Sequence, residues 1–233
     1  SQYSLWKTSK RQYYKKYSLG EESKTNKFFT KGKELGSYLQ MLNENVDNVD
    51  SKILAESISS DPMLFKIGQI VPTLDIMEDK LETEISGVKT ISFVDSANIE
   101  NTEFLEYKTG KVDPKGNDPW NQDKVENHGQ MLFYALSYYI KSGRESVPKG
   151  MLVWIETIEE NVVDELGNFS HTILKFTGRV EMFLREFLVA ELVDFEKDLL
   201  KTVKEIEDYE YNELEVAENV VERYIELKKM MDS

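Results

Sequence analysis

The sequence contains no cysteine, only two histidines and five prolines, and no apolar run long enough to span a membrane. Without cysteine, the chain can form no disulfide bond and cannot ligate an iron–sulfur cluster through thiolates. Its polar start also lacks the apolar core of a secretory signal. These absences predict a cytoplasmic protein that binds no iron–sulfur cluster and works away from the membrane.

Basic residues are scarce relative to acidic ones, at 29 Lys and Arg against 43 Asp and Glu, a net charge of −14. A surface that contacts nucleic-acid phosphates normally needs the opposite sign. The charge is uneven, because residues 1–33 hold eight Lys and one Arg against two Glu, which is +7 and leaves −21 for the other 200 residues. We therefore expect any nucleic-acid contact to involve the basic N-terminal segment.

The N-terminal segment interleaves aromatic and basic residues. Aromatic residues recur at steps of three, four and seven between Tyr3 and Tyr17, which predicts one face of a helix. Such a helix can pair with phosphates and stack on bases, or it can bury its aromatic side chains in the core and leave its lysines solvated. The candidate substrate-binding residues are Lys7, Arg11, Lys15 and Lys16.

The length of 233 residues suits a single domain of the α/β or α+β class. We divide it into a helical N-terminal part at 1–80, a core with the sheet at 81–190 and acidic C-terminal helices at 191–233. Runs rich in β-branched and aromatic residues predict one hairpin within 87–110 and another within 151–176, with a helix at 122–142 between them. The expected fold is a mainly antiparallel or mixed central sheet flanked by helices.

Two carboxylates and a lysine stand at the ends of neighbouring predicted strands. Asp95 ends the first apolar run, and Glu106 and Lys108 end the second, two positions apart, so that their side chains share one face. Converging carboxylates suit Mg²⁺ or Mn²⁺, with water completing the coordination. A lysine beside such an ion can orient or deprotonate an attacking water and balance charge on a phosphate. The pattern predicts phosphodiester hydrolysis, with Gln130 and Tyr134 neighbours on the following helix.

The order of these residues resembles the PD-(D/E)xK nuclease superfamily, and most closely its RecB-like exonuclease branch. The resemblance is carried by Asp95, the run EYKTG at 106–110 and the pair Gln130 and Tyr134, and it covers the middle of the chain better than the ends. It implies a restriction-endonuclease-like core in which Asp95 and Glu106 bind Mg²⁺ or Mn²⁺. It also implies that Lys108 serves the nucleophilic water and that Gln130 and Tyr134 support the site and contact substrate. On this basis we expect a metal-dependent DNA exonuclease of repair, recombination or phage DNA processing. The richness in Lys, Glu and Asn suits an A·T-rich bacterial or phage genome.

The sequence does not identify the third protein ligand of the metal. In the resembled family an upstream helix carries a histidine that often joins the metal site, but the matching position here is Gly36. Glu34 is a candidate substitute, and its alternative is an exposed position on the helix surface. Glu82 and Glu84 are further candidates, and the alternative for both is the outward face of a strand.

The loop at 109–121 is rich in Pro, Gly and Asp and separates the Lys108 strand from the Gln130 helix, so it is expected beside the site. Its Trp120 is a candidate to stack on a base, or to anchor the loop to the core. His128 precedes Gln130 by two positions and is expected to point elsewhere around the helix.

The sequence is also compatible with two other functional interpretations. The same fold could serve as a non-catalytic DNA-binding or scaffold subunit of a nuclease complex. Alternatively, the chain could be an acidic helical interaction protein in which Glu106 and Lys108 are accidental neighbours. The acidic helices from about Glu191 onward suit either packing on the domain or a protein partner.

Overall fold

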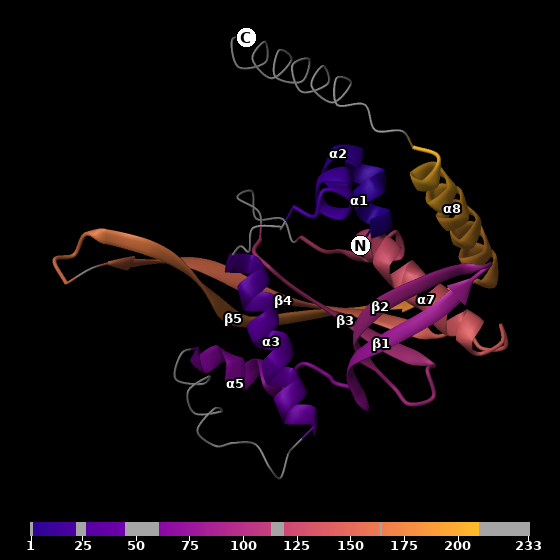
Figure 1. Cartoon of the computed structure of the whole chain (residues 1–233). Coiled ribbons are helices and arrows are strands. Elements are labelled where there is room, and N and C mark those ends of the chain that lie inside the picture. Colours follow the sequence, from indigo (N-terminus) through magenta and orange to yellow (C-terminus); the bar gives the residue numbers. More distant parts are fainter. Residues whose placement is uncertain (1, 22–26, 45–60, 113–118, 164, 210–233) are drawn as a thin grey trace. The chain divides into compact units, whose positions relative to one another are not determined.

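The computed structural model describes residues 2–21, 27–44, 61–112, 119–163 and 165–209 (Figure 1). The chain separates into two compact units, Lys24–Glu196 and a smaller one formed by Ser1–Ser23 with Lys197–Ser233. The second of the expected C-terminal acidic helices falls beyond residue 209 and lies outside the described residues. Within the described ranges, none of the helices combines the length and apolar character needed to cross a membrane.

The larger unit is built on one five-stranded sheet in the order β1-β2-β3-β4-β5. Neighbouring strands are antiparallel except for β3 and β4, which are parallel and therefore need a crossover connection. Helix α7 (Gly129–Lys141) lies in that crossover. The predicted fold, an α+β arrangement with a mixed sheet flanked by helices, is confirmed. The strands are β1 (Ile76–Ile85), β2 (Val88–Ala97), β3 (Glu103–Gly110), β4 (Lys149–Val163) and β5 (Phe169–Glu186).

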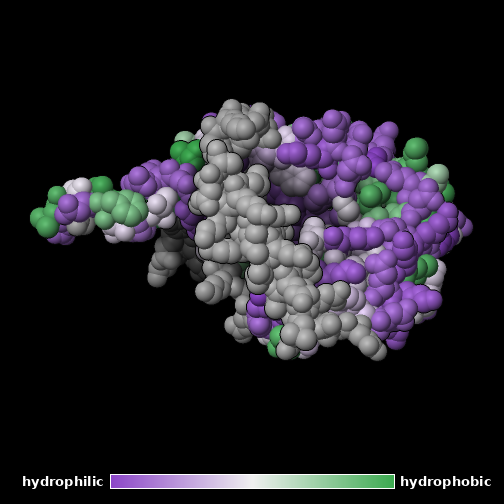
Figure 2. Space-filling model, turned by 90° about the horizontal axis from the view of Figure 1, so that it is seen from above, coloured by the Kyte–Doolittle hydropathy of each residue, from purple (hydrophilic) through white to green (hydrophobic). Residues whose placement is uncertain are grey.

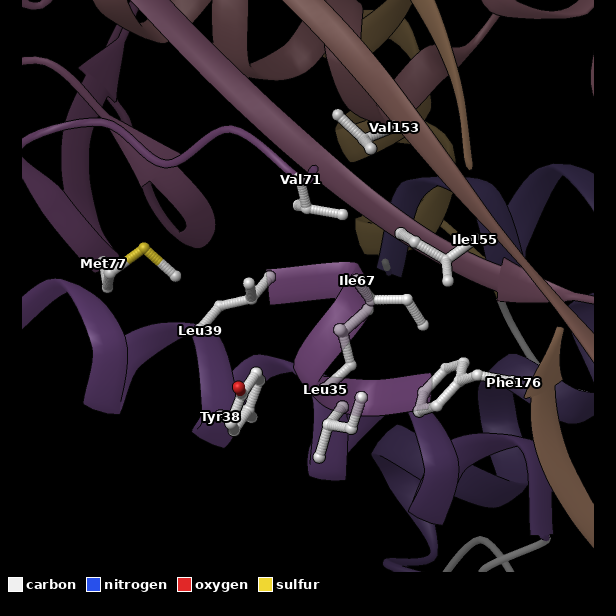
Figure 3. Close-up of a cluster of buried hydrophobic side chains, with 10 residues drawn as sticks. Leu35, Tyr38, Leu39, Ile67, Val71, Met77, Val153, Ile155 and Phe176 are labelled. Carbon is white, nitrogen blue, oxygen red and sulfur yellow. The ribbon is translucent and has the colours of Figure 1, made fainter. Parts of the chain in front are cut away.

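The two faces of the sheet carry different helices. Helices α3 (Lys27–Glu44) and α5 (Pro62–Gly68) pack on one face, where the apolar side chains of Figure 3 form a buried cluster. On the other face Phe104 of β3 stacks on Tyr138 of α7, with 6.0 Å between the ring centroids. Both faces are therefore covered near β3. The cluster contains Leu35, Tyr38, Leu39, Leu64, Ile67, Val71, Met77, Val153, Ile155 and Phe176.

The expected single helix over 122–142 is interrupted. Helix α6 (Gln122–Glu126) starts at Asn121, whose side chain accepts from the Lys124 amide at 2.9 Å. It ends at Asn127, and His128 is extended, with φ −79° and ψ 104°, before α7 begins at Gly129. The expectation was wrong at these two positions because the apolar spacing runs on through the break.

The hairpin of β4 and β5 is longer than predicted. Strand β3 pairs with β4 only as far as Glu156, and beyond that point β4 pairs with β5 alone. Strand β5 continues past Gly178, which has a φ of +85°, to Glu186. The tip exposes apolar side chains, among them Leu166 and Phe169, and it is the extension at the left of Figure 2.

In the smaller unit Trp6 and Tyr13 are core residues, whereas Tyr17 is exposed. Trp6 and Tyr13 are 3% and 9% exposed and meet edge to face at 5.2 Å between ring centroids. The predicted continuous helix is broken at Ser9, whose side chain accepts from the Gln12 amide at 3.3 Å. The elements are α1 (Gln2–Thr8), α2 (Lys10–Tyr13), a π-helical turn (Tyr14–Ser18) and the end of α8 (Val189–Glu207).

Candidate active site

The candidate site forms where β2 and β3 separate. The last pair of the ladder in this direction is Ser96 with Leu105, so the pairing does not extend to Asp95 and Glu106. The backbone N–H of Tyr107 donates instead to Asp95 Oδ2, at 2.6 Å. A buried strand amide without a backbone partner needs another acceptor, and here the carboxylate supplies it. This bond fixes Asp95 directly beside the Glu106 segment.

Lys108 joins Glu106 to the crossover helix. Its Nζ pairs with Glu106 Oε1 and donates to Gln130 Oε1 at 3.0 Å. Gln130 Nε2 in turn donates to the Tyr134 hydroxyl at 2.5 Å, and that hydroxyl donates to the Phe93 carbonyl at 2.6 Å. The structure thus brings four of the predicted residues into one hydrogen-bonded chain that runs from β3 through α7 to β2.

The two carboxyl groups are short of positive charge. Burial, followed by the charge of Glu106, raises the pKa of Asp95 to about 8. Burial also raises the pKa of Glu106, which is 2% exposed, and the neighbouring Lys108 ammonium opposes this effect. Glu106 Oε2 is buried and makes no hydrogen bond to any residue in the described part of the chain. Two adjacent carboxyls therefore share the charge of Lys108.

The donor set fits a hard divalent cation. Carboxylate oxygens are the ligands that Mg²⁺ and Mn²⁺ prefer, and the unpartnered Glu106 Oε2 is such an oxygen beside Asp95. As the side chains stand, the described residues contain no group of three or more His, Cys, Asp or Glu that could hold a metal ion. The pair alone thus leaves coordination positions to water or to a further group.

His128, at the start of α7, lies near Lys108 and contacts Trp120 of the preceding loop. The Trp120 ring meets the His128 ring edge to face, with 5.1 Å between centroids. Burial and the Lys108 ammonium lower the pKa of His128 to about 4, so His128 is neutral at neutral pH. His128 therefore lies near the Lys108 end of the site rather than away from it, because the helix break turns residue 128 out of the helical spacing.

Glu34, the candidate third ligand, has other partners. It pairs with Lys31 at 2.9 Å, and Lys31 also pairs with the buried Asp61 at 2.8 Å. No contact among the described residues joins Glu34 to Asp95 or Glu106. Its carboxylate instead helps to neutralise a lysine that is only 7% exposed.

Among the glutamates of β1, the one nearest the site is Glu78, which the sequence analysis did not select. Glu82 pairs with Lys80, and Glu82 and Glu84 are both exposed on the strand. Glu78 and Asp95 lie between the paired positions Met77 with Ser96 and Asp79 with Val94, and the charge of Glu78 contributes to the raised pKa of Asp95. The sequence carries no local signal for this neighbour, because it depends on which residues of two strands face each other.

The candidate substrate-binding residues of the N-terminal segment belong to the smaller unit. Lys7 pairs with Asp198 at 2.7 Å, and Lys15 pairs with Glu21 at 3.5 Å. The burial of Trp6 leaves its ring unavailable for stacking on a base, whereas the basic side chains reach the surface. Exposed or partly exposed candidates for phosphate contact are Lys7, Arg11, Lys15 and Lys16.

Comparison with other proteins adds no family to these observations. No protein-family model matches the chain, and none of the curated proteins matches it either. What the chain offers is therefore the chemistry of its own site: two adjacent carboxyls, a lysine held between one of them and a glutamine, and a tyrosine that fixes the glutamine.

Proposed function

We propose that the protein is a Mg²⁺- or Mn²⁺-dependent nuclease that hydrolyses phosphodiester bonds of DNA. The observation that carries the proposal is the adjacent pair Asp95 and Glu106, joined by Lys108 to Gln130 and Tyr134. The resemblance to RecB-like exonucleases favours DNA over RNA and attack at an end over internal cutting. DNA repair, recombination or phage DNA processing in the cytoplasm of a bacterial cell is the proposed setting.

In this proposal Asp95 and Glu106 hold the divalent cation. Such an ion polarises the scissile phosphate and lowers the pKa of a bound water. The Tyr107 amide holds the Asp95 carboxyl in place, and the burial of Glu106 limits the positions that its carboxylate can take. These residues therefore present a fixed pair of oxygens rather than two mobile side chains.

Lys108 acts on the attacking water and on the phosphate. Its ammonium group is held between Glu106 Oε1 and Gln130 Oε1, so its position is set by two acceptors. During hydrolysis the water oxygen bonds to phosphorus and gives up a proton to solvent, while the bond from phosphorus to the leaving sugar oxygen breaks and that oxygen takes up a proton from solvent. A fixed ammonium beside the phosphate stabilises the charge that develops on its oxygens. Tyr134 orients Gln130 and is in this sense a positioning residue.

The test is cleavage of end-labelled DNA by the parent protein and by Lys108→Ala. The substrates are linear and circular, single- and double-stranded, with RNA of the same sequence for comparison, in Mn²⁺, Mg²⁺ or EDTA. We expect metal-dependent cleavage by the parent and a loss of at least about 100-fold in the variant. A preference for linear DNA would indicate attack at an end.

Lys149→Ala is the matched control. Lys149 lies at the opposite end of the parallel pair, opposite Glu103, and its side chain is 58% exposed. Cleavage by this variant should stay within about twofold of the parent. Parent protein that binds DNA without cutting it would favour a non-catalytic DNA-binding or scaffold subunit. Protein that neither cuts nor binds would favour an acidic interaction protein that binds a partner through its C-terminal helices.

A further inference from the structure

Glu78 sits at an interruption of β1. The pairs on either side of it in the register put Glu78 directly opposite Asp95. Its φ of +55° is uncommon for a residue with a side chain. Met77 packs in the cluster under α3, whereas Asp79 accepts a hydrogen bond from Tyr138 of α7 at 2.8 Å. Residues two apart in a regular strand share a face, so the strand turns over at Glu78.

The interruption turns the Glu78 carboxylate toward α3. Its Oε1 lies 3.8 Å from the point that a Cβ atom at Gly36 would occupy. One turn earlier on the same helix, a Cβ atom at Gly32 would lie 3.5 Å from Oγ1 of Thr109, and Thr109 directly follows Lys108 in the sequence. The glycine face of α3 thus lies over the end of the site. The Glu78 carboxylate reaches the space that a side chain at position 36 would enter.

Glu78 also has the freedom to move. It is exposed and makes no hydrogen bond or ion pair with any residue that the structure describes. Asp95 and Glu106, by contrast, are held by the Tyr107 amide and by Lys108. A rotation of the Glu78 side chain is therefore enough to change the spacing of the three carboxylates.

We propose that Glu78 is the third acidic ligand of the divalent cation and that it approaches the site through the space left open at Gly36. The inference rests on the proposed function, because it needs the cation at Asp95 and Glu106. A second observation, apart from Glu78 itself, is that the buried Glu106 Oε2 accepts no hydrogen bond from the described residues and is therefore an acceptor open to a cation.

The test measures Mn²⁺ binding directly, by calorimetry and by electron paramagnetic resonance, with no substrate present. Glu78→Gln should bind Mn²⁺ at least about tenfold more weakly than the parent. Asp95→Asn should lose more, because Asp95 is central to the site. Glu84→Gln is the matched control on the same exposed strand and should bind within about twofold of the parent. Circular dichroism checks that each variant is folded.

The outcomes separate this inference from the proposed function. Binding by Glu78→Gln that equals the parent, with binding lost in Asp95→Asn, overturns the role of Glu78 and leaves the nuclease site standing. A parent that binds no Mn²⁺ overturns both. Adding Gly36→His to Glu78→Gln should restore most of the affinity, because a Cβ atom at position 36 meets only an ordinary contact. No recovery would overturn the statement that Glu78 approaches the cation through the space at position 36.

Discussion

Replacing Asp95 by asparagine tests whether the two carboxyl groups of the site, Asp95 and Glu106, have too little positive charge around them. Asparagine keeps a side-chain oxygen for the Tyr107 amide, removes the ionisable group and can donate its NH₂ to Glu106. Without metal, the pKa of Asp95 is about 8 in the folded protein, against about 3.9 for an exposed aspartate. The unfolded chain therefore loses its proton near pH 4, whereas the folded chain keeps it up to about pH 8. The free energy of unfolding falls as the pH rises through this window.

The size of the effect follows from the same window. Each pKa unit corresponds to about 1.4 kcal/mol, so the three units between pH 4 and pH 7 set an upper bound of about 4 kcal/mol. Water near the partly buried carboxyl screens the charges, which reduces the expected loss to about 1–3 kcal/mol. The variant avoids this loss. In EDTA at pH 7 we expect Asp95→Asn to be more stable than the parent by that amount.

Urea unfolding of both proteins between pH 4 and pH 9 in EDTA measures the difference. The stability gap should widen as the pH rises, and an exposed Asp123→Asn control should follow the parent. Mn²⁺ at about 1,000 times its dissociation constant should add about 4.1 kcal/mol to the parent and little to the variant, which reverses their order. A variant less stable than the parent at pH 8 in EDTA would refute the reasoning.

Three further substitutions probe the scaffold of the site. Gly150→Ala should cost about 1–3 kcal/mol in urea unfolding, because its Cβ atom would lie 2.7 Å from Phe104 Cζ; parent-like stability would contradict this packing. Asp61→Asn should cost about 1–3 kcal/mol, because it removes the buried one of the two carboxylates that pair with Lys31, and a thermal midpoint equal to the parent's would show that the charge of Asp61 is not needed. Tyr134→Phe should cost about 1–3 kcal/mol and lower nuclease activity, because a strand carbonyl loses its donor; full activity would argue against a positioning role.

The contacts between site residues that the sequence predicted depend on local geometry. Alternation along a strand put Glu106 and Lys108 on one face, and a spacing of four on a helix put Gln130 beside Tyr134. The short polar connection between the two strands brought Asp95 next to the Glu106 segment. Each of these relations is set by neighbours within a few positions of one another or by a single hairpin.

The parts that the sequence did not predict depend on contacts between distant segments. The break at His128 is invisible to apolar periodicity, because the buried side chains on either side keep helical spacing. Glu34 was a reasonable candidate by position, but the buried Asp61 draws Lys31 and Glu34 into another cluster. Glu78 was missed because nothing in its own segment marks it.

By itself the sequence determined the class of fold, the absence of thiolate metal chemistry and the order of the acidic and basic residues along the strands. The tertiary structure alone decided which side chains meet. The β2–β3 ladder ends before Asp95, so the Tyr107 amide donates to the Asp95 carboxylate instead of to a backbone carbonyl. Strand β1 changes face at Glu78, so the Glu78 carboxylate lies next to Gly36. These side-chain contacts depend on strand register and on the positions of the helices. Both are set by the burial of apolar side chains across the whole sheet rather than by any one segment.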